Sequence, residues 1–130
     1  MSSLHNKTVL VVDDDAGMLR ALSKVLTSEG ANVTAAVWGG EAADHLETRH
    51  GQFDLVITDL RMPVVNGSNI LTAVKSAFPH VPVIVITALG SPDVRSKCLA
   101  LGATAFLEKP LEAGALLAAA QAALDGQPQG

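Results

Sequence analysis

Acidic, hydroxyl and amine side chains recur in this 130-residue chain at the points where short apolar runs stop. Asp13 and Asp14 follow the first run, Asp59 follows the third, Thr87 closes the fourth, and Lys109 lies just beyond the fifth. Carboxylates held close together raise one another's pKa or require a counter-ion. A set of oxygen ligands with open positions suits Mg²⁺, which keeps several waters and accepts a phosphate oxygen. These residue types suit phosphoryl transfer onto a carboxylate, with Mg²⁺ and Lys109 offsetting the charge of the phosphoryl oxygens.

Taken one at a time, the same residues also have ordinary structural roles. A triple aspartate is a common end for a strand, and Asp15 is well placed to cap the following helix. A lysine before a proline is usually a solvated charge, and a threonine such as Thr87 often closes a strand. Other kinds of site lack support: no Ser-His-Asp or Cys-His order stands out, the four histidines fall away from the run ends, and no Gly-rich phosphate loop follows the first run.

The elements that must position these side chains are visible as two alternating patterns. Short β-branched runs cover residues 8–12, 32–36, 54–58, 82–87 and 103–107. They are nearly continuous in apolar residues, which is typical of strands buried on both faces. After each run, apolar residues recur at helical spacing: Leu19, Leu22, Val25 and Leu26; Ala42, Ala43 and Leu46; Ile70, Leu71 and Val74; Val94, Cys98 and Leu101; Leu116, Leu117, Ala120 and Leu124. The alternation predicts an α/β domain with five parallel strands and five helices.

Helix boundaries and strand ends follow from the punctuation of the sequence. Gly30 and Gly102 stand just after helical segments, where a left-handed residue closes a helix, and Ser91 with Pro92 is typical of a helix start. In an open parallel sheet, ligands bind beyond the carboxyl ends of the strands. Four of the five runs end in polar groups, so we expect the acids, the threonine and the lysine to converge on that edge.

Composition narrows the class of protein. The formal net charge of −4 excludes a broadly basic nucleic-acid binder, and 48% hydrophobic with 17% charged residues excludes disorder. The single cysteine, Cys98, excludes an internal disulfide scaffold and suits a reducing compartment. No apolar stretch is long enough to cross a bilayer, and residues 1–7 lack the apolar region of a signal peptide. We expect one soluble cytoplasmic domain without direct contacts to nucleic acid or membrane.

In this order, the motifs resemble the receiver domain of bacterial two-component response regulators, in particular chemotaxis-regulator-like ones, and the resemblance covers nearly everything from Lys7 to Leu124. It rests on residues 9–15 (VLVVDDD), 54–63 (DLVITDLRMP) with Gly67, 86–88 (ITA), and Gly102 and Ala103 followed by 106–110 (FLEKP). Each motif is weak alone, but all occur in order at the ends of the expected strands. The resemblance implies a flavodoxin-like, doubly wound sheet in the order 2-1-3-4-5. It implies one receiver domain over residues 1–130, with a core at about 7–124 and a polar tail or linker start at 125–130.

The resemblance also implies a function, that of a signalling phosphoacceptor rather than an enzyme, beyond catalysis of its own phosphorylation and dephosphorylation. Asp59 is implied to accept a phosphoryl group from a histidine of a sensor kinase or phosphotransfer protein. Mg²⁺, with Mn²⁺ as a substitute, is implied to be bound by Asp14 directly, by Asp13 through water, by Asp59, and by the backbone carbonyl of Arg61.

A switch and an output surface are implied in the same way. Lys109 is implied to pair with the phosphoryl group, and the Thr87 hydroxyl and the Ala88 backbone to bind it. Phe106 is implied to change rotamer as Thr87 moves, because phosphorylation adds charge and acceptor oxygens that favour one of two existing arrangements. The fourth helix, fifth strand and fifth helix are implied to control an output domain or a downstream effector.

Some positions depart from the commonest receiver pattern. Arg61 and Leu89 stand at sites that influence the lifetime of the phosphoryl group, and Asn66 stands where an aspartate is frequent. Phe106 lacks the hydroxyl of a tyrosine. No Lys or Arg follows Lys109, which disfavours dimerisation through charged pairs on the fourth and fifth helices.

Two other functions stay open. Asp13 and Asp15 stand two apart, as in haloacid-dehalogenase-like Mg²⁺-dependent phosphohydrolases, but the chain is short and has no cap insertion. A non-phosphorylated, receiver-like interaction module is disfavoured because every key residue is present. The sequence also leaves open the cognate kinase, the pathway, the phosphoryl lifetime, the oligomeric state, whether the chain is stand-alone or part of a longer regulator, and whether the Lys109–Pro110 bond is cis. Trp38 is expected to be a partly buried anchor, and Cys98 a buried, inert thiol.

Overall fold

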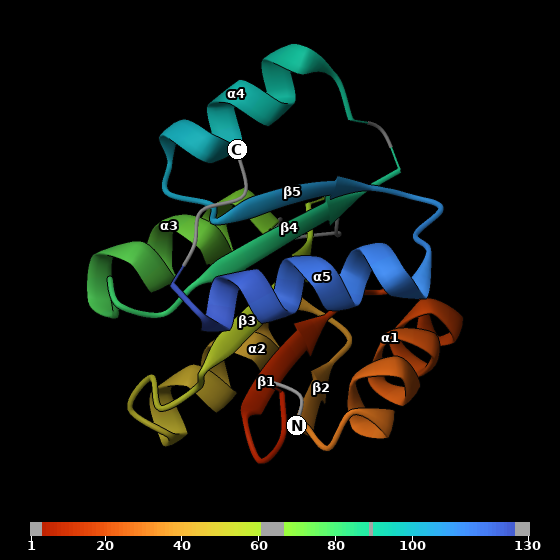
Figure 1. The fold of residues 1–130 in the computed structure, drawn as a ribbon. Helices are drawn as coiled ribbons and strands as arrows, with labels where there is room; N and C mark the ends of the chain where they lie inside the picture. The colour runs from red at the N-terminus through yellow and green to blue at the C-terminus, as the bar shows by residue number, and fades with distance from the viewer. Residues whose placement is uncertain (1–3, 61–66, 89, 127–130) are drawn as a thin grey trace.

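The computed structural model of the chain describes residues 4–60, 67–88 and 90–126, with 67–69 as backbone only. Within these ranges, the strands are β1 (Thr8–Val12), β2 (Asn32–Ala36), β3 (Leu55–Asp59), β4 (Val83–Thr87) and β5 (Ala105–Glu108). The helices are α1 (Ala16–Ser28), α2 (Gly39–Thr48), α3 (Gly67–Ala77), α4 (Pro92–Ala100) and α5 (Ala113–Leu124). The strands pair in parallel in the order β2-β1-β3-β4-β5 (Figure 1). This is the doubly wound, flavodoxin-like arrangement that the sequence predicts.

Two apolar layers hold the helices to the two faces of the sheet. Buried residues of α1 and α5 form one layer, and buried residues of α2, α3 and α4 form the other (Figure 1). The strands supply both layers because successive side chains point to opposite faces. In β1, Val9 and Val11 contribute to the α1 side, whereas Leu10 and Val12 contribute to the other. Apolar burial on both faces explains why the runs are nearly continuous in apolar residues.

The fifth strand begins later than its apolar run. The sequence predicts a strand from Ala103, but β5 begins at Ala105. The Ala103 N–H instead donates to the Cys98 carbonyl at 3.0 Å and closes α4, with Gly102 in the left-handed region at φ +107°. At their other ends, β3 and β5 each extend one residue further than predicted, to Asp59 and Glu108.

The predicted helix ends are confirmed. The Asp15 side chain accepts hydrogen bonds from the N–H groups of Gly17 (2.9 Å) and Met18 (3.2 Å) at the start of α1. The Ser91 hydroxyl accepts from the Val94 N–H at 3.2 Å, with Pro92 as the first residue of α4. Gly30 closes α1 at φ +89°. The elements that position the strand ends are therefore fixed by local capping.

The predicted apolar stripes are partly wrong on α2 and α4. Ala43 is exposed, and Leu101 is 37% exposed. Leu99 packs against the apolar layer in place of Leu101, and Cys98 is the one fully buried residue of α4. Trp38 is 48% exposed, more open than the anchor that the sequence predicts, because its ring lies over Gly40 at the start of α2 rather than in a core layer.

No helix in the described ranges is both long enough and apolar enough to cross a membrane.

Candidate functional site

Three acids meet at the carboxyl edge of the sheet. Asp13 follows β1 directly, and its N–H donates to the Ala36 carbonyl at 3.1 Å, while Asp59 is the last residue of β3. Asp13 is 0% exposed and Asp59 6%, whereas Asp14 is exposed. One carboxylate oxygen from each lies within 4.8 Å of the other two. Neighbouring strands of a parallel sheet end side by side, so the sequence places these carboxylates together.

Lys109 lies between the two buried acids. Its Nζ is 3.0 Å from Asp13 Oδ2 and 3.2 Å from Asp59 Oδ2, and it donates a hydrogen bond to each. The Lys109 N–H donates to the Thr87 carbonyl at 2.8 Å, which ties the residue to the end of β4, and the following Lys109–Pro110 bond is cis. Burial lowers the pKa of Lys109, but hydrogen bonds and charges from Asp13 and Asp59 outweigh burial and raise the pKa overall.

The start of α1 orients Asp13. Its Oδ1 accepts a hydrogen bond from the Asp15 N–H at 2.9 Å, and Asp15 in turn caps α1. Because one oxygen is held by the backbone in this way, the other, Oδ2, is directed to Lys109. The triple aspartate therefore has both roles considered for it, with Asp15 as the cap and Asp13 in the acid cluster.

Thr87 and Phe106 lie on adjacent strands. Thr87 is the fully buried last residue of β4, and Ala88, directly after it, is exposed. Phe106 of β5 pairs with Val85 and is 4% exposed, with its side chain in the layer of α2, α3 and α4. The structure thus places the threonine at the site edge and the aromatic ring inside the apolar layer.

Three of the singled-out residues, Arg61, Asn66 and Leu89, lie outside the described residues. Two contacts near the site were not predicted. The Thr58 hydroxyl donates to the Asp59 carbonyl at 3.0 Å, and Arg95 of α4 donates through Nη1 to the Phe106 carbonyl at 3.3 Å. The Arg95 contact joins two elements through a backbone oxygen, and no sequence pattern reports such a pairing.

The donor set fits a hard divalent cation. Three carboxylates against one ammonium leave an excess of negative charge, which a divalent ion would balance. Oxygen ligands in small number, with room for water and phosphate oxygens, are what Mg²⁺ prefers in proteins. The arrangement can therefore hold a cation and present the Asp59 carboxylate, next to Lys109, to an incoming anion.

Comparisons with a family model and with known relatives point to the same protein family. A family model described as the response regulator receiver domain matches residues 9–121. The response regulator FleR of Pseudomonas aeruginosa is 39% identical over 109 residues, which cover 84% of this chain and 23% of FleR. The transcriptional regulatory protein PrrA of Mycobacterium tuberculosis is 37% identical over 116 residues, which cover 89% of this chain and 49% of PrrA. The chain thus spans between about a quarter and about half of the length of these relatives.

Solved structures of similar shape belong to the same family. A response regulator receiver domain protein from Clostridium thermocellum has a TM-score of 0.87 at 31% identity, covering 92% of this chain and 95% of that one. A CheY-like receiver domain protein from Methanospirillum hungatei has a TM-score of 0.87 at 30% identity, covering 94% of this chain and 96% of that one. Together with the strand order and the family model, these matches show that the chain belongs to the response-regulator receiver domains of two-component signalling.

Proposed function

We propose that Asp59 is the phosphoacceptor of this receiver domain and that its donor is a phosphohistidine of a sensor kinase or phosphotransfer protein. An Asp59 carboxylate oxygen attacks phosphorus, the P–N bond to the histidine breaks, and the ring nitrogen keeps the electron pair. The observation that carries the proposal is the nearly buried Asp59 carboxylate, held 3.2 Å from Lys109 Nζ within a cluster of acids. Phosphoryl transfer depends mainly on such positioning and charge stabilisation.

We assign the metal site to Asp13, Asp14, Asp59 and the backbone carbonyl of Arg61, with Mg²⁺ as the ion and Mn²⁺ as a substitute. When bound, the ion offsets negative charge on the phosphoryl oxygens. Support comes from the three oxygen donors that lie within 4.8 Å of one another. Asp13 keeps one oxygen bonded to the Asp15 N–H, so its other oxygen has a fixed direction toward the site.

The switch is proposed to begin with Lys109, Thr87 and Ala88. Lys109 pairs with a phosphoryl oxygen, and the Thr87 hydroxyl and the Ala88 N–H donate to the others. Phe106, two residues of register away from Thr87 on the neighbouring strand, changes rotamer as the threonine moves. The two arrangements differ in their affinity for the phosphoryl oxygens, so phosphorylation shifts the population between them.

We further infer that residues 1–130 form a single receiver domain, with a core at about 7–124, acting in the cytoplasm. Its output passes through α4, β5 and α5 to an output domain or a separate effector. Its enzymatic role is limited to its own phosphorylation and dephosphorylation. The match of the receiver-domain model to residues 9–121 favours this role over an aspartyl phosphohydrolase or a non-phosphorylated module.

Intact-mass spectrometry after incubation with acetyl phosphate tests the acceptor. We expect the wild type to gain one phosphoryl group with Mg²⁺ and none after chelation, and Asp59→Asn to gain none under either condition. Asp44→Asn is the matched control, since it removes an exposed acid on α2, and it should behave as the wild type. A gain retained in Asp59→Asn would overturn the assignment.

Beryllofluoride gives a second readout that needs no phosphodonor, because it stands in for a phosphoryl group on an aspartate. With Mg²⁺, it should change the amide spectrum at Thr87 and Phe106 in the wild type and not in Asp59→Asn. Absence of both beryllofluoride binding and phosphorylation would favour a non-phosphorylated module. Turnover of p-nitrophenyl phosphate would favour a phosphohydrolase.

A further inference from the structure

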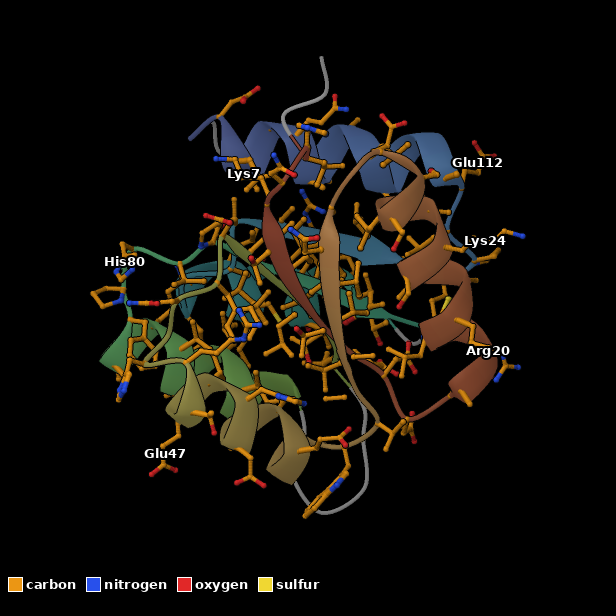
Figure 2. The ribbon with its side chains drawn as sticks, turned by 90° about the horizontal axis from the view of Figure 1, so that it is seen from below. Lys7, Arg20, Lys24, Glu47, His80 and Glu112 are labelled. Carbon is orange, nitrogen blue, oxygen red and sulfur yellow. The ribbon has the colours of Figure 1, made fainter. Side chains whose placement is uncertain are left out.

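The edge strand β2 is open on one side. In the described part of the chain, β2 pairs with β1 alone, and it is the least buried strand, with Asn32 and Ala35 exposed. Figure 2 views the molecule from the β2 side and shows no helix in front of this strand. An unpaired strand edge is a template for pairing with another extended chain.

Val33 and Ala35 of β2 direct their backbone groups to the open side, whereas Asn32 and Ala36 direct theirs to β1. The Asn32 N–H donates to the Lys7 carbonyl at 2.8 Å, and the Ala36 carbonyl accepts from the Asp13 N–H at 3.1 Å, so both residues face β1. Because successive residues of a strand alternate in direction, Val33 and Ala35 present their N–H and C=O groups away from β1. An added strand would find backbone donors and acceptors at both positions.

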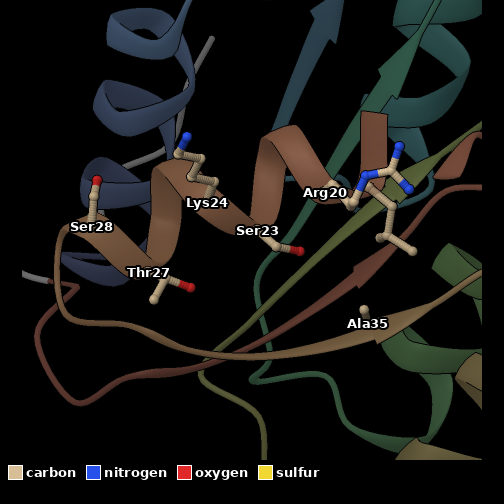
Figure 3. Close-up of a pocket in the computed structure, with 7 residues that line it drawn as sticks. Arg20, Ser23, Lys24, Thr27, Ser28 and Ala35 are labelled. Carbon is tan, nitrogen blue, oxygen red and sulfur yellow. The ribbon is translucent and has the colours of Figure 1, made fainter. Parts of the chain in front are cut away.

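A groove lies beside this edge, between α1 and β2. Its volume is about 620 Å³, and Leu19 and Ala35 contribute to its lining. Ser23 and Thr27 point from α1 toward β2, and the Ala35 methyl group points back toward the helix (Figure 3). Side chains on one face of an added strand would enter this space.

The charge of the groove indicates which chain fits. Arg20 and Lys24 of α1 lie at its rim and project away from the body of the protein (Figure 2), and neither forms an ion pair with a described residue. Antiparallel edge pairing between two copies would place α1 of each copy on the same side of the joined sheet, which brings these cations closer together. Like charges across an interface oppose association, so the groove favours an acidic partner over a second copy.

An apolar surface continues the edge. Val37 and Trp38 directly follow β2 and are 45% and 48% exposed, two of the three large apolar side chains with high exposure in the described residues. Large exposed apolar side chains next to an unpaired strand are typical of interaction sites.

We propose that β2 is a docking edge for an extended acidic segment of a partner protein, which adds as a further strand and places its acids at Arg20 and Lys24. Backbone bonds to Val33 and Ala35 supply affinity, and the groove with its basic rim supplies selectivity. The surface lies at the edge of the sheet opposite β5, and the proposal does not depend on phosphorylation of Asp59.

A displayed library of random heptapeptides, selected on the full chain, tests the occupant. We expect enriched sequences with acids at alternate positions, which lie on one face of a strand. An enriched peptide, made synthetically and titrated against the protein, should change Trp38 fluorescence and protect the Val33 and Ala35 amides from exchange. N-methylation of the peptide backbone at its bonding positions should weaken binding at least tenfold.

Four variants make the result specific. Arg20→Glu and Lys24→Glu should each weaken binding about tenfold, whereas Lys97→Glu, which reverses an exposed charge on α4, should not. Ala35→Pro removes an outward-facing N–H that β1 does not use and should weaken binding while circular dichroism and phosphorylation stay unchanged.

The proposal is overturned by enrichment without acids, by binding that survives both charge reversals, or by a concentration-dependent dimer that Ala35→Pro dissociates. The last result would assign the edge to a second copy.

Discussion

Strand β3 passes through two different environments within five residues. Leu55, Val56 and Ile57 are fully buried in the apolar layers, whereas Asp59, two residues beyond Ile57, lies among acids with Lys109 beside it. Burial of an apolar side chain stabilises the fold by about 1.5–3 kcal/mol. Burial of like charges opposes folding unless they are paired.

The same change of environment occurs in the neighbouring strands. β1 ends at buried Val12 and is followed directly by buried Asp13, and in β4, buried Ile86 precedes buried Thr87. The middles of the strands therefore stabilise the fold, whereas their carboxyl ends hold groups that reduce its stability. The site is held in place because the apolar layers directly beneath it are rigid.

The largest expected effect on the free energy of unfolding comes from a substitution in the apolar middle of β3. Ile57→Ala should lower the free energy of unfolding by about 3 kcal/mol, because it leaves a cavity in the layer of α1 and α5. Urea unfolding followed by circular dichroism measures the change, with Ile57→Val as a milder control at about 1 kcal/mol. A loss below that of the valine variant would show that the middle of β3 is not the stabilising region.

The next largest effect on the free energy of unfolding is expected for a substitution of Lys109. Lys109→Met should lower the free energy of unfolding by about 2 kcal/mol without divalent cation, because Asp13 and Asp59 lose their shared partner. The cost is below that of a fully buried pair, since the Lys109 side chain is 16% exposed. Thermal unfolding with and without Mg²⁺ checks this, and Mg²⁺ should recover more stability in the variant than in the wild type. Equal stability of variant and wild type would contradict it.

Removal of one acid should have the opposite sign. Asp59→Asn should raise the free energy of unfolding by about 1 kcal/mol without divalent cation, because it relieves repulsion among three carboxylates. Lys109 keeps its bond to Asp13 in this variant. Urea unfolding in the presence of a chelator measures the gain, and Asp44→Asn should leave stability unchanged. A loss of stability in Asp59→Asn would mean that its pairing with Lys109 outweighs the repulsion.

The smallest expected effect is a pH dependence of stability that arises from the buried thiol of Cys98. Burial raises its thiol pKa, and the smaller effect of the Lys97 charge lowers it. Above the ordinary thiol pKa, the unfolded chain loses its proton while the folded chain retains it, so the unfolded state binds fewer protons and stability falls as pH rises. Stability should therefore decline between pH 8 and pH 9.

Comparison with Cys98→Ala isolates that contribution. Urea unfolding of both proteins at pH 8 and pH 9 should show the additional slope in the wild type and not in the variant. Identical slopes would show that the thiol ionises as easily in the folded chain as in the unfolded one.

The order of elements could be predicted because it rests on local patterns. Continuous apolar runs report burial on both faces, and residues such as Asp15, Ser91 and Gly102 mark helix ends through bonds within their own turn. The predicted burial of a side chain was wrong where burial depends on packing against elements that are distant in the sequence. Ala43 and Leu101 fit a helical stripe but are exposed, because a helix buries only the side chains that its neighbours cover.

Part of the site was predictable for a different reason. Asp13, Asp59, Thr87 and Lys109 each end or follow a strand, and a parallel sheet brings such ends to one edge. Which atoms meet could not be predicted. The bond between Lys109 and Asp13 joins residues 96 positions apart, and its length depends on the packing of every strand between them.

By itself, the sequence determined the alternation of strands and helices, the family motifs and the edge on which the acids gather, because each of these depends on residue type and local spacing. The tertiary structure alone decided that Lys109 contacts both Asp13 and Asp59, that Arg95 holds the Phe106 carbonyl, and that a groove opens between α1 and β2. These features arise where side chains from distant parts of the chain share one space, and their fit depends on volumes and directions that only packing fixes.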